Sequence, residues 1–289
     1  MNCLSNIKKS LLLNYKSWFF LVIALILISL KDLTGCAMNL GKGFATFGIL
    51  FVASHVLHYW AHFKRAYPQN IVHLYHHEHN NFFSHFLQII VEFVSAMSYM
   101  WLKYNVSYMS FFNEWIIIFY YLFYTTIHNI NYSILHVNNV HELHHKFRIK
   151  NMGPDICDIM FGTKYNVEDG IENTDHYIPN IIICLIITML LKSFWDGREN
   201  KAPYEIALKY IFGGCIGLLT LSTMYLVYEG KIKNEEHPEP EAAPAKEPEA
   251  APAKEPEAAP EKEPEAAPTK EPEAAPAKEP ETVKPSETE

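Results

Sequence analysis

Residues 44–62 read FATFGILFVASHVLHYWAH, an apolar run without acidic residues, lysine or arginine that ends in closely spaced histidines. The hydrocarbon core of a bilayer, about 30 Å thick, is crossed by roughly 20 such residues in an α-helix. A helix suits this environment because it satisfies its own backbone hydrogen bonds inside lipid. The run therefore predicts a transmembrane helix that carries histidines at one membrane surface.

Similar apolar segments lie on both sides of this run. They cover about residues 11–30, 82–102, 111–127, 178–195 and 206–228. Because some are short or contain an acidic residue, such as Glu92 or Glu114, we expect four to six transmembrane helices. The predicted fold class is an all-α integral membrane protein, which excludes an ordinary soluble enzyme of 289 residues.

The C-terminal part of the chain has a different chemistry. From Glu239 to Lys278 the octapeptide Glu-Pro-Glu-Ala-Ala-Pro-X-Lys occurs five times, so proline recurs at every fourth position. Proline at that spacing excludes regular helix and sheet, and a composition without aromatic residues cannot form a core. We expect residues 231–289 to be a disordered tail that acts as an extended spacer.

These patterns divide the chain into four parts. Residues 1–43 are expected to form a membrane anchor and lumenal loop, 44–177 a histidine-box catalytic membrane domain, 178–230 a transmembrane hairpin and 231–289 the tail. With a cytosolic N-terminus, nine lysines and arginines around the first four segments face the cytosol and three face the other side. This follows the positive-inside bias, so the histidines and the tail are predicted to be cytosolic. Without a basic patch interleaved with aromatic residues, no nucleic-acid partner is expected.

Three histidine clusters carry the predicted chemistry. They read HxxxH, HxxHH and HxxHH, and each lies at or near the cytosolic end of a predicted helix. Residues at positions i, i+3 and i+4 share one face of a helix, so each cluster presents its imidazoles together. Eight imidazoles suit two metal ions, and iron, zinc and copper all accept this ligand. The predicted di-metal cap contains His58, His62, His73, His76, His77, His141, His144 and His145.

The histidines outside these clusters have a different expectation. A single histidine in a membrane segment is usually a satisfied polar group that faces the bundle interior. This is what we expect for His55, His79, His85 and His176. His128 and His136 border the clusters without belonging to one, so spacing alone leaves both a structural and a ligand role open.

The three clusters together resemble the fatty acid hydroxylase superfamily, which includes sterol desaturases and methyl-sterol oxidases. Residues 141–165, HELHHKFRIKNMGPDICDIMFGTKY, are similar to the last box of that family and the elements that follow it. These elements are Asn-aromatic-Gly, an aspartate and Phe-Gly-Thr, here Asn151-Met152-Gly153, Asp158 and Phe161-Gly162-Thr163. Met152 replaces the usual aromatic residue. The resemblance covers roughly residues 45–165.

This resemblance implies a membrane-bound non-haem di-iron oxygenase. It would use O2 to hydroxylate or desaturate a lipid, either a fatty acyl or sphingolipid chain or a sterol, with zinc as an alternative metal after purification. The eight box histidines would be ligands, and His128 would join them. Some relatives carry a further histidine four residues later, where this chain has Tyr132, which leaves His136 as an alternative ligand.

The resemblance also implies partners and a location. The chain has no flavin, nicotinamide or haem-attachment motif, so electrons must come from another protein. A cytochrome b-type donor and its reductase, in the endoplasmic reticulum membrane, are what the family implies.

Two other functions fit part of the pattern. Residues 141–145, HELHH, satisfy the HExxH motif, in which His141 and His145 would bind zinc and Glu142 would act as general base of a membrane metalloprotease. This interpretation leaves six of the eight box histidines without a role. A non-catalytic metal-binding membrane scaffold is the second alternative.

Overall fold

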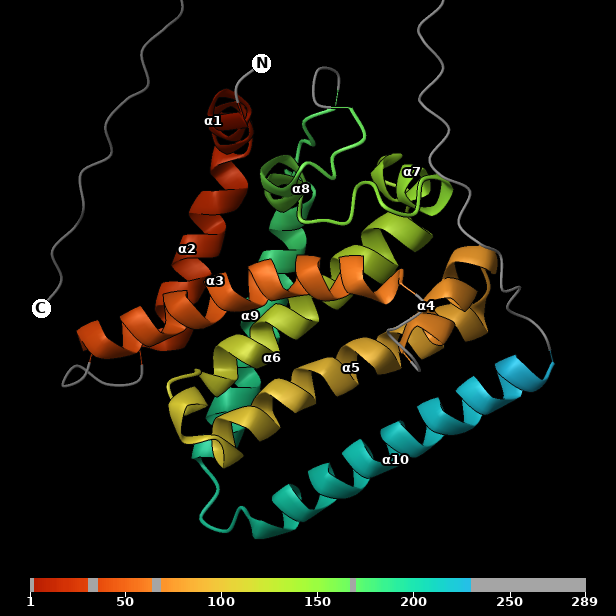
Figure 1. The fold of residues 1–289 in the computed structure, drawn as a ribbon. Coiled ribbons are helices and arrows are strands. Elements are labelled where there is room, and N and C mark those ends of the chain that lie inside the picture. The colour runs from red at the N-terminus through yellow and green to blue at the C-terminus, as the bar shows by residue number, and fades with distance from the viewer. Residues whose placement is uncertain (1–2, 31–35, 64–68, 167–169, 230–289) are drawn as a thin grey trace, which may run out of the picture. The chain divides into compact units, whose positions relative to one another are not determined.

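A computed structural model describes residues 3–30, 36–63, 69–166 and 170–229 (Figure 1), and these residues contain helices but no strand. The predicted tail, residues 231–289, lies outside the described residues. In chain order the elements are α1 (Cys3–Leu13), α2 (Tyr15–Ser29), α3 (Cys36–Ala61), α4 (Gln69–Glu78), α5 (Phe82–Asn105), η1 (Ser107–Met109), α6 (Glu114–Thr125), η2 (Thr126–Ile134), α7 (Val140–Lys146), α8 (Asp155–Phe161), α9 (Tyr177–Asp196) and α10 (Ala202–Tyr228).

Four of these helices are long and apolar enough to cross a membrane. They are α3, α5, α9 and α10. A fifth crossing is possible if α1 and α2 count together, but these helices meet at a bend of 75° after Leu13. The predicted segment 11–30 is thus a straight helix only from Tyr15 onward. Among the described residues the candidate spans number four, or five with the bent pair, which agrees with the expected four to six.

Helix α6 by itself is shorter than the transmembrane helix expected over residues 111–127. It has only 12 residues and continues directly into η2, a π-helix. Its side chains Ile116, Ile117 and Phe119 are almost completely buried, and α6 packs against α2, α3, α5 and α9. The apolar composition of this segment therefore reflects its position at the centre of a helix bundle.

Helix α10 packs on the outside of α4 and α5 (Figure 1). Leu226 of α10, which is 1% exposed, joins a small core that includes Ile71 and Val72 of α4 and Leu87 of α5. Helix α4 carries one of the histidine clusters, so α10 supports that cluster from behind.

Candidate metal centre

The eight box histidines come together at one end of the bundle. They arrive from the C-terminal end of α3 and from the short helices α4 and α7. Two groups form, and within each group the ligand nitrogens lie within 4.8 Å of one another. The first group consists of His58, His62, His73, His77 and His144, and the second of His76, His141 and His145. The rings of His77 and His145 stack 4.2 Å apart, so the two groups adjoin.

Several pairs of ring nitrogens approach each other closely. The Nε2 atom of His73 lies 3.0 Å from Nε2 of His62 and 3.1 Å from Nε2 of His77. In the second group, Nε2 of His145 and Nε2 of His141 are 2.9 Å apart. Two imidazoles bound at right angles to one metal, with bonds of about 2.1 Å, would have nitrogens about 3 Å apart. These separations therefore fit ligands of shared metal ions.

Acceptors outside the cluster fix the orientation of two rings. Nδ1 of His58 donates to the carbonyl of Met152 at 2.7 Å, and Nδ1 of His144 donates to the carbonyl of Lys150 at 2.7 Å. A carbonyl only accepts, so the proton sits on Nδ1 and Nε2 keeps its lone pair. In the described part of the chain, both Nε2 atoms are buried without a hydrogen-bond partner. Outer hydrogen bonds of this kind are usual for metal-binding histidines.

His128 repeats this arrangement with a carboxylate. Its Nδ1 lies 2.7 Å from Oε1 of Glu92, and Thr125 donates to the other carboxylate oxygen at 2.6 Å. Its Nε2 is buried and has no hydrogen-bond partner among the described residues. The ring of His128 lies 4.7 Å from that of His141 and 5.4 Å from that of His76. His128 thus borders the second group, with its free nitrogen unused by the protein.

The residues after the last box form the loop that supplies the carbonyls of Lys150 and Met152. Asp158 accepts hydrogen bonds from the backbone N–H groups of Met152 and Gly153, both at 2.8 Å, and from the Thr163 hydroxyl at 2.6 Å. Gly162 ends α8 in the left-handed conformation, with φ of 71°, which favours glycine. The motif therefore has a physical role: it holds the loop that orients His58 and His144.

The protonation state of the cluster also suits metal binding. Burial, followed by the charges of neighbouring imidazoles, lowers the pKa of His73, His76, His77, His141 and His144. For His145 burial lowers the pKa to about 4. These rings are therefore neutral near pH 7, which is the form that binds a metal.

Three histidines expected to be structural have protein partners. His55 uses both nitrogens, with Nδ1 3.0 Å from the carbonyl of Gly153 and Nε2 3.5 Å from Thr163. His79 and His176 each bond a nearby backbone carbonyl through Nδ1. His136, the alternative ligand, is exposed and belongs to neither group within the described residues.

His85 also has a protein partner, because its Nε2 lies 2.7 Å from Oδ1 of Asn80, but it lies close to the second group. Its ring lies 4.9 Å from that of His76, at the edge of the second group. Sequence reasoning missed this neighbour because His85 follows the second box by eight residues, across the break between α4 and α5.

Tyr132 points away from the metal centre. Its ring stacks on that of His141 at 5.8 Å, but its hydroxyl lies 2.6 Å from both Glu172 and the Tyr177 hydroxyl. Burial raises the pKa of Glu172 to about 7. Tyr132 therefore does not act as a ligand in place of a histidine.

The geometry of α7 argues against the metalloprotease interpretation. His141 and His145 belong to the second group, but His144 belongs to the first. Glu142, which would have to reach the metal-bound water as a general base, is exposed. Residues 141–145 satisfy HExxH only because this motif overlaps the HxxHH box, and the glutamate of the motif does not lie at the site.

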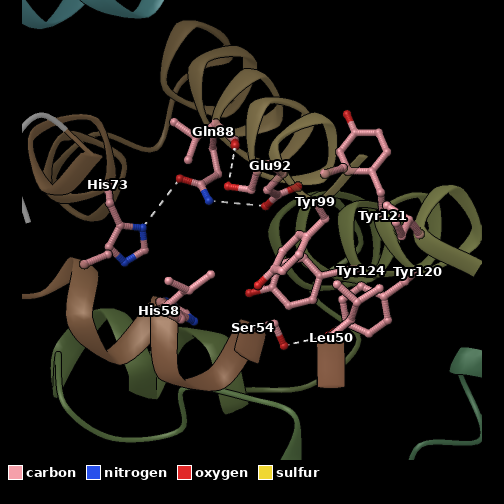
Figure 2. A pocket seen from close by; sticks show the side chains of 16 residues that line it. Leu50, Ser54, His58, His73, Gln88, Glu92, Tyr99, Tyr120, Tyr121 and Tyr124 are labelled. Atoms are coloured by element: carbon pink, nitrogen blue, oxygen red, sulfur yellow. Dashed lines mark hydrogen bonds between the residues drawn. The ribbon is translucent and has the colours of Figure 1, made fainter. Parts of the chain in front are cut away.

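A cavity of about 110 Å³ lies between α3, α5 and α6, beside the first group. Figure 2 shows His58 and His73 on one side of this cavity and Tyr99, Tyr120 and Tyr121 on the other. The apolar part of its wall includes Leu50, Leu57, Val91, Ala96 and Ile117. The cavity thus adjoins both the histidines of the first group and apolar side chains of two candidate membrane helices.

Comparison of the chain with protein-family models, with curated proteins and with solved structures finds no match. The described residues form a helical structure, in which four helices are long and apolar enough to span a membrane and two histidine groups could hold metal ions.

Proposed function

We propose that this protein is a membrane-bound non-haem di-iron oxygenase that hydroxylates, or desaturates, a lipid with O2 and external electrons. The observation that carries the proposal is the common arrangement of His58, His128 and His144. In each, the Nδ1–H group donates a hydrogen bond to a fixed acceptor, and the buried Nε2 atom has no hydrogen-bond partner in the described structure. Burying polar atoms without a hydrogen-bond partner is unfavourable unless another group binds them. A cluster of neutral imidazoles is suited to binding metal ions.

The residues fit two metal ions, one for each group. When bound, two irons would supply the reductive activation of O2 that oxidation of an unactivated carbon requires. The protein's contribution is to hold the ligands in place. The loop carbonyls and Glu92 fix the rings, and burial keeps the imidazoles neutral.

The cavity supports a lipid substrate. Its wall is mainly apolar, and its helices α3 and α5 are candidate membrane spans. An acyl chain or sterol in the bilayer would enter between these helices and bring one carbon close to His58 and His73. The apolar wall would also exclude water from the reacting carbon.

The remaining parts of the proposal concern electrons and location. Because the sequence has no cofactor motif of its own, we propose a cytochrome b-type donor with its reductase, acting at the cytosolic face of the endoplasmic reticulum membrane. The tail, residues 231–289, would extend into the cytosol from the end of α10.

The test begins with metal content. Detergent-purified protein should contain about two iron or zinc ions per chain, and His76→Ala/His144→Ala, which removes one ligand from each group, should lose both. His136→Ala, which changes an exposed histidine, is the control and should keep them. Iron-loaded wild type, supplied with reductant and lipid extract, should then consume O2 only when lipid is present. Absence of metal from anaerobically purified wild type would refute the oxygenase, and bound metal without lipid-dependent O2 uptake would favour a scaffold.

A further inference from the structure

His85 occupies the beginning of α5, where a local motif fixes the backbone. Asn81 caps the helix by accepting from the backbone N–H of Ser84, and the Ser84 hydroxyl lies 3.3 Å from the backbone N–H of Asn81. The N–H of His85 in turn bonds the carbonyl of Asn81 at 3.2 Å. This double cap anchors the first turn of α5 and therefore sets the direction of the His85 side chain.

The two ring nitrogens of His85 have different surroundings. Nε2 lies 2.7 Å from Oδ1 of Asn80, so the Nε2–H group donates a hydrogen bond to this amide oxygen. Nδ1 therefore carries the lone pair, and in the described residues it is buried without a hydrogen-bond partner. His58, His128 and His144 also have one bonded and one unbonded nitrogen, but in those residues Nδ1 is bonded and Nε2 lacks a partner among the described residues. His85 as a whole is half-buried, whereas its Nδ1 atom is buried.

The second group lacks donors that the first group has. Five histidines make up the first group and three make up the second. Both nitrogens of His76 are buried and without a hydrogen-bond partner in the part of the chain that the structure describes. The rings nearest to His76 outside its group include His128 at 5.4 Å and His85 at 4.9 Å. Tyr132 cannot add a donor because its hydroxyl is bonded to Glu172 and Tyr177.

We propose that His85 is a ligand of the second metal ion, binding it through Nδ1. With His128 it raises the second group from three nitrogen donors to five, which equals the first group. Asn80 has the orienting role for His85 that Met152 and Lys150 have for His58 and His144. This inference rests on the proposed di-metal centre, but it assigns a donor that lies outside all three histidine boxes.

Zinc binding to the metal-free, full-length protein in detergent tests the assignment without requiring substrate or electrons. Wild type should bind two Zn²⁺ in competition with a chromophoric chelator. His85→Ala should bind the first with wild-type affinity. It should bind the second more weakly by at least the roughly 10- to 100-fold that loss of a ligand's outer partner causes. Asn80→Ala, which keeps Nδ1 but removes the orienting partner, should weaken the second site by a smaller factor. His79→Ala is the matched control, because His79 lies close in sequence and its ring bonds the backbone carbonyl of Tyr75 in α4.

The outcomes are distinct. Two zinc ions bound to His85→Ala with wild-type affinity would overturn the assignment while leaving the di-metal centre intact. No zinc bound to wild type would overturn the proposed function itself. If His85→Ala loses both metals, His85→Gln, which better preserves side-chain volume, decides: retention of the first ion alone supports the assignment, and loss of both overturns it.

Discussion

Single hydrogen bonds outside the cluster decide where the histidine rings point. The carbonyls of Met152 and Lys150 and the carboxylate of Glu92 each accept from an Nδ1–H group at 2.7 Å. Because an imidazole with one protonated nitrogen offers its lone pair only on the other, these three acceptors select the nitrogen that is left to bind a metal in the candidate site. The site therefore depends on residues that bind no metal themselves.

Asp158 provides the sharpest test of this dependence. Asp158→Ala would leave two backbone N–H groups and the Thr163 hydroxyl in a buried site without their acceptor. We expect a loss of on the order of 4 kcal/mol of stability and metal affinity lowered about 10- to 100-fold. Thermal unfolding in detergent and chelator competition measure the two effects. Asp196→Ala, at an exposed position, should change neither, and unchanged metal affinity in Asp158→Ala would contradict the orienting role of the loop.

Glu172 gives a prediction about pH. Burial raises its pKa to about 7 from an ordinary value of 4.5, so the native state favours the protonated acid. The stability from this acid is complete below pH 4.5 and is lost as the pH rises through 7. Glu172→Gln cannot ionise and keeps an oxygen to accept from Tyr132 and Asn138.

The variant should therefore match wild type near pH 4.5 and exceed it at pH 8 by up to about 3 kcal/mol. Unfolding temperatures of both proteins at the two pH values measure this difference. Glu199→Gln, at an exposed position, should show no such dependence. An equal difference between variant and wild type at both pH values would show that folding does not raise the pKa of Glu172.

At the scale of helices, the spacing of the histidines does not predict which of them share a metal-binding group. The HxxHH pattern shows that three imidazoles share a face, but it does not show that the face is divided between two groups. In α4, His73 and His77 join the first group and His76 the second, whereas in α7 only His144 joins the first. This division is set by how α4 and α7 meet α3, which is a tertiary property.

Hydropathy has a similar limit. Residues 111–127 and residues 44–62 are both strongly apolar, yet α6 is surrounded by other helices and α3 is a candidate membrane span. An apolar composition indicates that a segment is shielded from water. It does not indicate whether protein or lipid surrounds the segment. The position of His85 was not predictable for a related reason: no helical period connects residues on two different helices.

Substitutions in α10 test whether its packing against α4 stabilises the histidines that α4 carries. Leu226 is 1% exposed in a core with Ile71 and Val72 of α4, whereas Leu221 of the same helix is 67% exposed. Leu226→Ala should lower stability by about 2–4 kcal/mol and weaken metal binding through α4. Leu221→Ala, the matched control, should leave both nearly unchanged in detergent. Equal effects of the two substitutions would mean that α10 does not support α4.

At the scale of the whole molecule, the metal centre lies at one end of the bundle and η1 at the other. Helix α5 connects them: His85 lies in its first turn and η1 follows its last residue. A helix of this length, 24 residues, extends about 36 Å, which exceeds the thickness of the hydrocarbon core. If the centre faces the cytosol, Tyr108 of η1, which is 77% exposed, must face the lumen.

Two cysteine reporters distinguish the two orientations. Cys3 is exposed on α1, and α1 packs on α8 at the end of the bundle that holds the centre. In a chain whose other cysteines are alanine, a membrane-impermeant maleimide should label Cys3 in sealed microsomes. A matched chain with Cys3→Ala and Tyr108→Cys should be labelled only after detergent opens the vesicles. The reverse pattern would place the histidines in the lumen, where a cytosolic reductase could not reach them, and the proposed electron donor would then be wrong even if the metal centre is right.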